Sequence, residues 1–164
     1  MGRYYNPQAK QVLREQQFDT CGSCYNEGQY MEAHHIVPVW AGGSTNIAEG
    51  MNGVMLCKPC HINQDNLNVL GELWGDIPLE DCDISQIEDW DKYERALEQV
   101  ELNRHNPELI KKIYTKHLAW QLYTEGMEYQ ELLDKIASIE GATGQVITAD
   151  EVVDTARGFL HETN

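Results

Sequence analysis

The chain has 164 residues, enough for one domain with a hydrophobic core or for a small metal module followed by a helical extension. Its apolar runs fall short of the ~20 residues that a membrane-spanning helix needs, and its start, MGRYYNPQAK, does not resemble an apolar signal segment. We therefore expect a cytoplasmic protein without membrane contact, whose cysteines favour metal binding over disulfides.

The charge is strongly negative and unevenly distributed. Twelve Lys and Arg residues against 27 Asp and Glu residues give a net charge of −15. Residues 1–70 hold four basic and six acidic residues, a net of −2, whereas residues 71–164 hold eight and 21, a net of −13. DNA-binding proteins usually present a basic face, because phosphate contacts supply most of their non-specific affinity. The charge therefore disfavours DNA binding by the second half rather than by the first.

The first half predicts a ββα unit. Residues 8–18 favour a short helix, with Asn6 as N-cap and a proline in the first turn. A strand over 30–37 ends at a proline, a glycine-rich loop covers 40–50, a second strand covers 54–56, and a helix follows over 58–70. The order strand, loop, strand, helix is that of a ββα module at residues 1–70.

The second half, residues 71–164, predicts an α-helical extension. Residues 71–84 resemble a linker, and Ser85 with Glu88 forms a capping-box pattern that opens a helix to about Asn103. Further helices are predicted from Pro107, over 128–139, and after a second capping box at residues 148–151. The expected fold class is α+β, with a small metal-stapled module followed by acidic helices.

Four cysteines occur in two pairs with the spacing of metal ligands. A Cys-x-x-Cys turn lets two thiolates face one ion, and two such turns make the tetrahedral set of a structural zinc site. The alternatives are two disulfides or free buried thiols. Cys82 has no partner by spacing and is expected to be a buried or linker thiol. The predicted zinc ligands are Cys21, Cys24, Cys57 and Cys60.

Three histidines lie close to these cysteines in the sequence. His34 and His35 are adjacent on the first predicted strand and so point to opposite sides, while His61 follows the second cysteine pair directly. His34 and His61 are candidate ligands for a second, open divalent metal, which leaves His35 to accept a proton from water. Asn52 can orient a histidine or pin the loop by hydrogen bonds. The alternative is that the three histidines are structural or that one replaces a cysteine on zinc.

The order CGSC…HHIVP…GG…N…LCKPCH, from about residue 20 to residue 64, resembles the HNH endonucleases of the ββα-metal (His-Me finger) superfamily, in the four-cysteine zinc subtype of phages and bacteria. The resemblance implies a zinc-stapled ββα-metal nuclease module in which His34 and His61 hold the catalytic metal. It implies that His35 is the general base and that Asn52 is the middle residue of the motif. Gly53 stands where an apolar residue usually follows that asparagine, so Asn46 is the alternative.

The resemblance further implies hydrolysis of double-stranded DNA to 5′-phosphate and 3′-hydroxyl ends in a bacterial or phage-infected cytoplasm. The implied cofactors are a structural Zn²⁺ and a catalytic Mg²⁺, Mn²⁺ or Ni²⁺. The net charge of −13 on residues 71–164 suggests a basic protein partner that brings the DNA, a solvated face turned away from it, or adaptation to high salt. It also leads us to expect a raised pKa for His35. The alternative function is a zinc-stabilised acidic protein-binding module or DNA mimic with a silent nuclease site.

Overall fold

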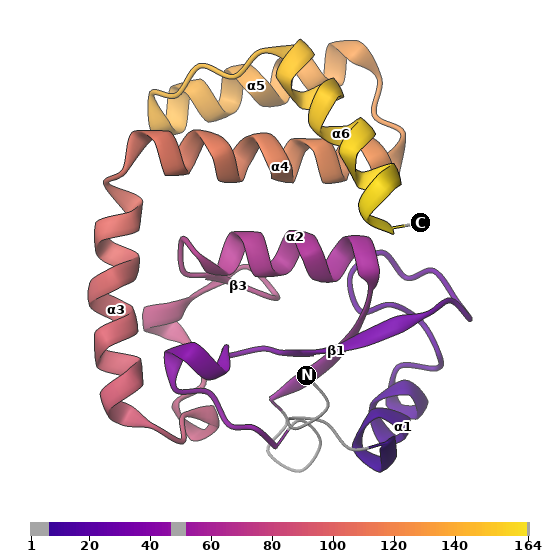
Figure 1. Cartoon of the computed structure of the whole chain (residues 1–164), viewed down its shortest axis with the longest axis vertical. Helices are drawn as coiled ribbons and strands as arrows, with labels where there is room; N and C mark the ends of the chain where they lie inside the picture. Colours follow the sequence, from indigo (N-terminus) through magenta and orange to yellow (C-terminus); the bar gives the residue numbers. More distant parts are fainter. Residues whose placement is uncertain (1–6, 47–51, 164) are drawn as a thin grey trace.

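The computed structural model describes residues 7–46 and 52–163. Figure 1 shows a lower part built around a β-hairpin and an upper part made of helices. Among the described residues, no helix combines the length and hydropathy that crossing a bilayer requires. The helices and strands are, in chain order, α1 (Pro7–Gln16), β1 (Met31–His35), β2 (Gly53–Cys57), α2 (Lys58–Asn68), β3 (Glu72–Leu73), β4 (Ile77–Pro78), α3 (Trp90–Arg104), α4 (Pro107–Glu125), α5 (Tyr129–Thr143) and α6 (Ala149–Thr163).

The predicted ββα unit is present. β1 pairs antiparallel with β2, with Met31 opposite Cys57 and His34 opposite Val54, and α2 follows β2 without a loop. The inner face of the hairpin is apolar and packs in a first core with α1. The Gln17 side chain fastens the end of α1 to the hairpin, because it accepts a hydrogen bond from the Met55 amide (2.8 Å) and donates one to the Met55 carbonyl (3.0 Å).

A second core crosses the boundary that the sequence led us to expect at residue 70. Val37 and Ala41 pack with side chains that come from after that boundary: Leu73, Leu79, Cys82, Ile87, Tyr93, Ala96 and Val100. Residues 71–84, expected as a linker, instead form the β3–β4 hairpin and the 3₁₀ turn Leu79–Asp81. α3 therefore lies along the side of the ββα unit (Figure 1).

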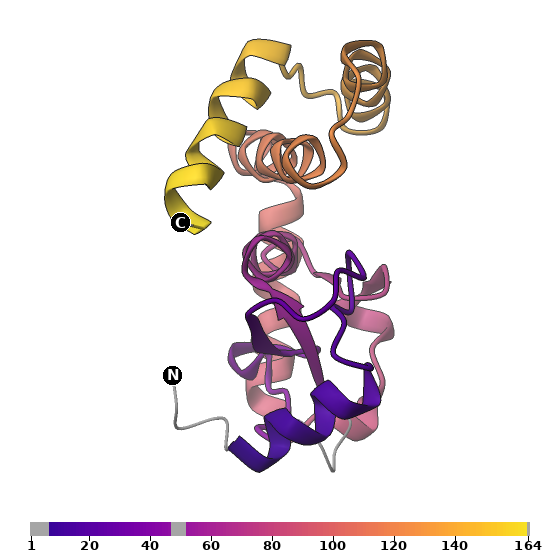
Figure 2. The same ribbon diagram turned by 90° about the vertical axis from the view of Figure 1, so that its right-hand side faces the viewer.

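The remaining helices form a third core. Figure 2 shows successive layers, with α1 and the β-hairpin below, α2 and α4 above them, and α5 and α6 on the far side. α4 contacts α2 through polar side chains: Asn66 donates to the Ile113 carbonyl (2.9 Å), and the His117 imidazole lies 3.0 Å from the Asn63 amide oxygen. The apolar side chains between α4, α5 and α6 include Leu118, Leu132, Val152 and Phe159.

The two predicted capping boxes have different outcomes. The box at Thr148 and Glu151 is confirmed by its two reciprocal hydrogen bonds, of 3.1 and 3.2 Å. The box at Ser85 and Glu88 is wrong. α3 begins at Trp90 with Asp89 as its N-cap, and the Glu88 carboxylate accepts a hydrogen bond from the Thr45 amide instead of from Ser85. A long-range partner thus replaces the local one.

Candidate metal centres

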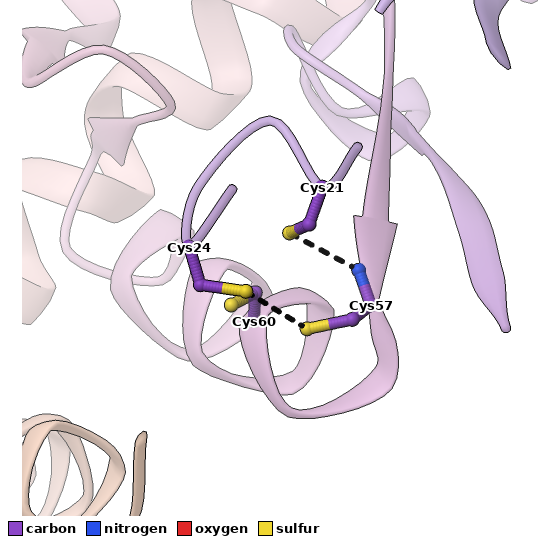
Figure 3. A group of neighbouring side chains, drawn as sticks. All are labelled: Cys21, Cys24, Cys57 and Cys60. Carbon is purple, nitrogen blue, oxygen red and sulfur yellow. Dashed lines mark hydrogen bonds between the residues drawn. The ribbon is translucent and has the colours of Figure 1, made fainter. Parts of the chain in front are cut away.

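The four paired cysteines converge on one point (Figure 3). Cys21 and Cys24 come from the turn after α1, whereas Cys57 ends β2 and Cys60 lies in the first turn of α2. Their sulfur atoms all lie within 4.8 Å of one another, and Cys24 Sγ is 3.7 Å from Cys57 Sγ. A tetrahedron with Zn–S bonds of about 2.3 Å has edges of about 3.8 Å, so the cluster fits a structural zinc ion.

The electrostatics of the cluster are consistent with a cation site. The Cys21 sulfur accepts hydrogen bonds from the amides of Ser23 (3.4 Å) and Cys57 (3.3 Å). Hydrogen bonds from the Cys57 and Cys60 thiols hold the pKa of Cys21 well below its ordinary value, and the same contact with Cys21 raises the pKa of Cys57 to about 12. One thiolate is thus stabilised, but further negative charge on these buried sulfurs needs a metal ion to offset it.

The disulfide alternative for the cysteines does not fit this geometry. A disulfide needs sulfur atoms about 2 Å apart, and all five described cysteines are free thiols. Cys82 is buried in the second core, as expected, and burial raises its pKa. It takes no part in the cluster.

The two adjacent histidines end β1 and face different partners. Both are buried, with 2% exposure for His34 and 7% for His35. His34 Nδ1 lies 3.4 Å from an Asp65 carboxylate oxygen on α2, and the centroids of the His34 and His61 rings are 5.1 Å apart. His34 and His61 therefore lie next to each other, although they come from β1 and α2.

Asp65 completes this group and was missed by the sequence analysis. His61 Nε2 lies 3.5 Å from the second Asp65 oxygen, and one ligand atom from each of His34, His61 and Asp65 falls within 4.8 Å of the others. Residues four apart share one face of a helix, so the spacing from His61 to Asp65 could have indicated it. The Asp65 side chain is 62% exposed, which opens the group to solvent. Two imidazoles and a carboxylate fit a divalent metal with open positions.

A second carboxylate fixes the orientation of His61. Glu32 lies on β1 two residues before His34, and its Oε1 is 3.0 Å from His61 Nδ1. The other ring nitrogen of His61 then faces Asp65. A carboxylate on the outer nitrogen of a histidine ligand sets its tautomer and raises its basicity, as second-layer partners do in metal sites.

His35 contacts the loop after β1 rather than α2. Its imidazole donates a hydrogen bond to the backbone carbonyl of Thr45. Burial lowers the pKa of His35 below its ordinary value, and this bond opposes the shift only in part. The expectation of a raised pKa is therefore wrong: desolvation outweighs distant acidic charge, and the neighbouring His34 and His61 lower the pKa further.

Asn52 pins the same loop from the inside. Its side chain is fully buried, with Oδ1 accepting from the Val37 amide (2.8 Å) and Nδ2 donating to the carbonyls of Val37 (3.0 Å) and Ser44 (2.8 Å). Asn46, the alternative for this role, is exposed, and its backbone amide donates to the Ser44 hydroxyl. The sequence analysis allowed Asn52 either to orient a histidine or to hold the loop, and its hydrogen bonds support the second role.

Comparison with protein families agrees with this geometry. The family model of the HNH endonuclease matches residues 21–67. Residues 21–67 therefore match an HNH endonuclease domain, and we call this segment the HNH domain. No curated protein and no solved structure matches the chain at a significant level.

The HNH domain contains all the metal-site residues described above. The four cysteines, both halves of the histidine site and Asn52 lie between residues 21 and 67. The four-cysteine cluster assigns the domain to the zinc subtype. The acidic helices lie outside the match, but the second core joins their first part to the HNH domain.

Proposed function

We propose that the chain is a metal-dependent HNH endonuclease that hydrolyses phosphodiester bonds of DNA, with His35 as general base. One observation carries the proposal. A buried imidazole, held by the Thr45 backbone, lies next in sequence to His34, which shares a ligand group with His61 and Asp65. This adjacency on β1 supports a general base that works next to a metal site, the combination used in metal-assisted phosphodiester hydrolysis.

His35 is suited to take a proton at neutral pH. Because burial lowers its pKa, the imidazole is neutral at pH 7 and can accept a proton from an attacking water. The hydrogen bond to the Thr45 carbonyl uses one nitrogen of the His35 ring and restricts rotation of that ring. Asn52 supports this arrangement by holding the Ser44 carbonyl, one residue away.

His34, His61 and Asp65 would hold the catalytic ion, and Glu32 would orient His61. When bound, a divalent metal supplies positive charge to the scissile phosphate and to the departing oxygen. Mg²⁺ prefers oxygen ligands, whereas imidazoles suit Mn²⁺ and Ni²⁺. A set of two imidazoles and one carboxylate is therefore compatible with any of these three ions as the catalytic metal. The exposure of Asp65 leaves the site within reach of a large substrate.

Cleavage of supercoiled plasmid tests the proposal. Purified protein is treated with EDTA, given Mg²⁺, Mn²⁺ or Ni²⁺, and compared with His35→Ala and with the control His105→Ala, an exposed histidine at the end of α3. We expect metal-dependent cutting that His35→Ala reduces by about 100-fold or more, the usual contribution of a general base, with zinc content unchanged. Cutting by His35→Ala at the wild-type rate would show that another group is the base.

The net charge of −13 on residues 71–164 bears on the partners. We propose that a basic protein binds these helices and helps to bring double-stranded DNA to the HNH domain. Binding of the chain alone to duplex DNA at ~150 mM salt tests this, because the Debye length there is about 8 Å and long-range repulsion is screened. Tight binding without a partner would contradict it.

The same charge favours a second candidate function, an acidic protein-binding module or DNA mimic whose nuclease site is silent. The plasmid assay separates the two. An absence of cutting with every metal, by protein that holds its full zinc content, would support the module.

A further inference from the structure

A short segment from outside the HNH domain runs beside the loop that contacts His35 and Asn52. Residues 86–89 precede α3, and residues 42–45 follow the turn after β1. The Ser44 amide donates to the Gln86 carbonyl (2.7 Å), and the Gly42 carbonyl accepts from the amides of Glu88 (2.7 Å) and Asp89 (3.1 Å). A β-bridge joins Gly43 to Ile87 between these bonds. We call residues 86–89 the outer clamp.

The glycine pair of the loop is shaped by this close approach. A Cβ on Gly42 would lie 2.2 Å from the Asp89 carbonyl oxygen, and Gly42 has a φ of +87°. A Cβ on Gly43 would lie 1.8 Å from the Val37 carbonyl oxygen. Only glycine fits in both places, because a side chain would collide with backbone that cannot yield. The glycine pair therefore lets the loop pack closely against the outer clamp at Gly42 and against Val37, just after β1, at Gly43.

One side chain of the clamp reaches the residue that holds His35. Glu88 Oε2 accepts a hydrogen bond from the Thr45 amide at 3.0 Å, and the Thr45 carbonyl accepts one from the His35 imidazole. The loop is thus held from two sides: Asn52 binds the Ser44 carbonyl from within, and Glu88 binds the Thr45 amide from outside. Hydrogen bonds to a carboxylate are roughly twice as strong as those between neutral groups.

We propose that Glu88 is a positioning residue for the general base, and that the outer clamp completes the active site of the HNH domain from the helical extension. The inference rests on the proposed role of His35. Glu88 acts through Thr45: its carboxylate binds the N–H of the Ser44–Thr45 peptide, whose carbonyl Asn52 binds, and the next carbonyl along the chain, that of Thr45, accepts the hydrogen bond from the His35 imidazole. The helical extension is therefore part of the catalytic unit rather than an appendage to it.

Kinetics of three full-length variants test the proposal. Glu88→Ala removes the acceptor and the charge, Glu88→Gln removes the charge but keeps an acceptor oxygen, and Glu94→Ala removes the same charge from an exposed position on α3. We expect Glu88→Ala to lower kcat by about fivefold to tenfold, the net size of one solvent-exposed hydrogen bond, with KM and the Mn²⁺ requirement within about twofold of wild type. Glu88→Gln should keep at least half of the wild-type kcat, and Glu94→Ala all of it.

Two kinetic results would overturn the proposal: a wild-type kcat in Glu88→Ala, or equal losses in Glu88→Ala and Glu88→Gln, which would show that the charge acts rather than the bond. A second measurement does not depend on cleavage. In nuclear magnetic resonance spectra, Glu88→Ala should shift the Thr45 amide and the His35 ring nitrogens, and Glu94→Ala should shift neither. If the wild type cuts no DNA, the proposed function fails, and unchanged Thr45 and His35 signals in Glu88→Ala would then refute the clamp separately.

Discussion

Replacing Asn52 with alanine removes the buried hydrogen bonds that hold the segment from Val37 to Ser44. The side chain is fully buried and makes three hydrogen bonds of 2.8 to 3.0 Å, two of them to Val37. Each such bond contributes about 1 kcal/mol net, and a buried amide left without an acceptor costs about 1–3 kcal/mol. Because Val37 is itself fully buried, water does not readily replace the lost acceptor. We expect Asn52→Ala to lower the free energy of unfolding by about 3–4 kcal/mol.

The assay is urea unfolding in zinc-saturated buffer, followed by tryptophan fluorescence. With a slope of about 2 kcal/mol per molar urea, the midpoint should fall by about 1.5–2 M. Asn52→Asp is a sharper variant, since it keeps the acceptor for the Val37 amide but turns a carboxylate oxygen toward the two carbonyls that Nδ2 now serves. It should destabilise the protein at least as much as alanine does.

Asn46→Ala is the matched control for this prediction, because Asn46 is exposed and alanine retains the backbone amide that donates to the Ser44 hydroxyl. It should change the free energy of unfolding by less than about 0.5 kcal/mol, as surface substitutions usually do. Equal effects of Asn52→Ala and Asn46→Ala, or a loss below about 1 kcal/mol in Asn52→Ala, would refute the assignment of Asn52 as the residue that pins the loop.

Four further outcomes are expected. Asp65→Asn should weaken binding of catalytic Mn²⁺ by about tenfold or more, measured by metal titration of cleavage, while zinc stays at one ion per chain; unchanged affinity would remove Asp65 from the ligand group. Cys60→Ser should release zinc and unfold the HNH domain by circular dichroism, since zinc binding contributes about 10–16 kcal/mol to such folds; a folded variant without zinc would contradict this. Because burial lowers the pKa of His35, and the base works when neutral, cleavage should be lost on acidification only below pH ~6.5, and a loss centred above pH 7 would argue against it. Burial also lowers the pKa of His117 to about 4, so the folded state loses stability as pH falls below the unfolded value of 6.5, by about 2 kcal/mol down to pH 5; His117→Gln should remove that slope, and an equal slope in both proteins would contradict the assignment.

The linear pattern was sufficient for the zinc cluster, the histidine site and the ββα unit. Cys21 with Cys24, and Cys57 with Cys60, are each held three residues apart by local turns, so their convergence needs only a hairpin between them. His34 and His61 lie close to this cluster in the sequence, because His34 is the last but one residue of β1 and His61 follows Cys60 directly on α2. Where spacing along the chain fixes geometry, the pattern predicted it.

Other features depended on contacts between distant segments. Ser85 and Glu88 satisfy the local rule for a capping box, but the Thr45 amide offers Glu88 a partner 43 positions away, and tertiary packing of Ile87 places it there. Residues 71–84 have the composition of a linker, yet Leu73 and Leu79 are drawn into the core beside Val37. The direction of the His35 pKa shift also depends on burial of the imidazole, which is not predictable from the net charge of the chain.

The sequence by itself was sufficient to predict the four-cysteine cluster, because ligand type and short spacing are local properties. Only the tertiary structure decided how the loop at residues 42–45 is held, since Asn52 and Glu88 bind it from different parts of the chain. It also decided that the acidic extension supports the HNH domain. The physical reason is that a loop without periodic structure takes its conformation from the groups that satisfy its backbone, and those groups are chosen by packing.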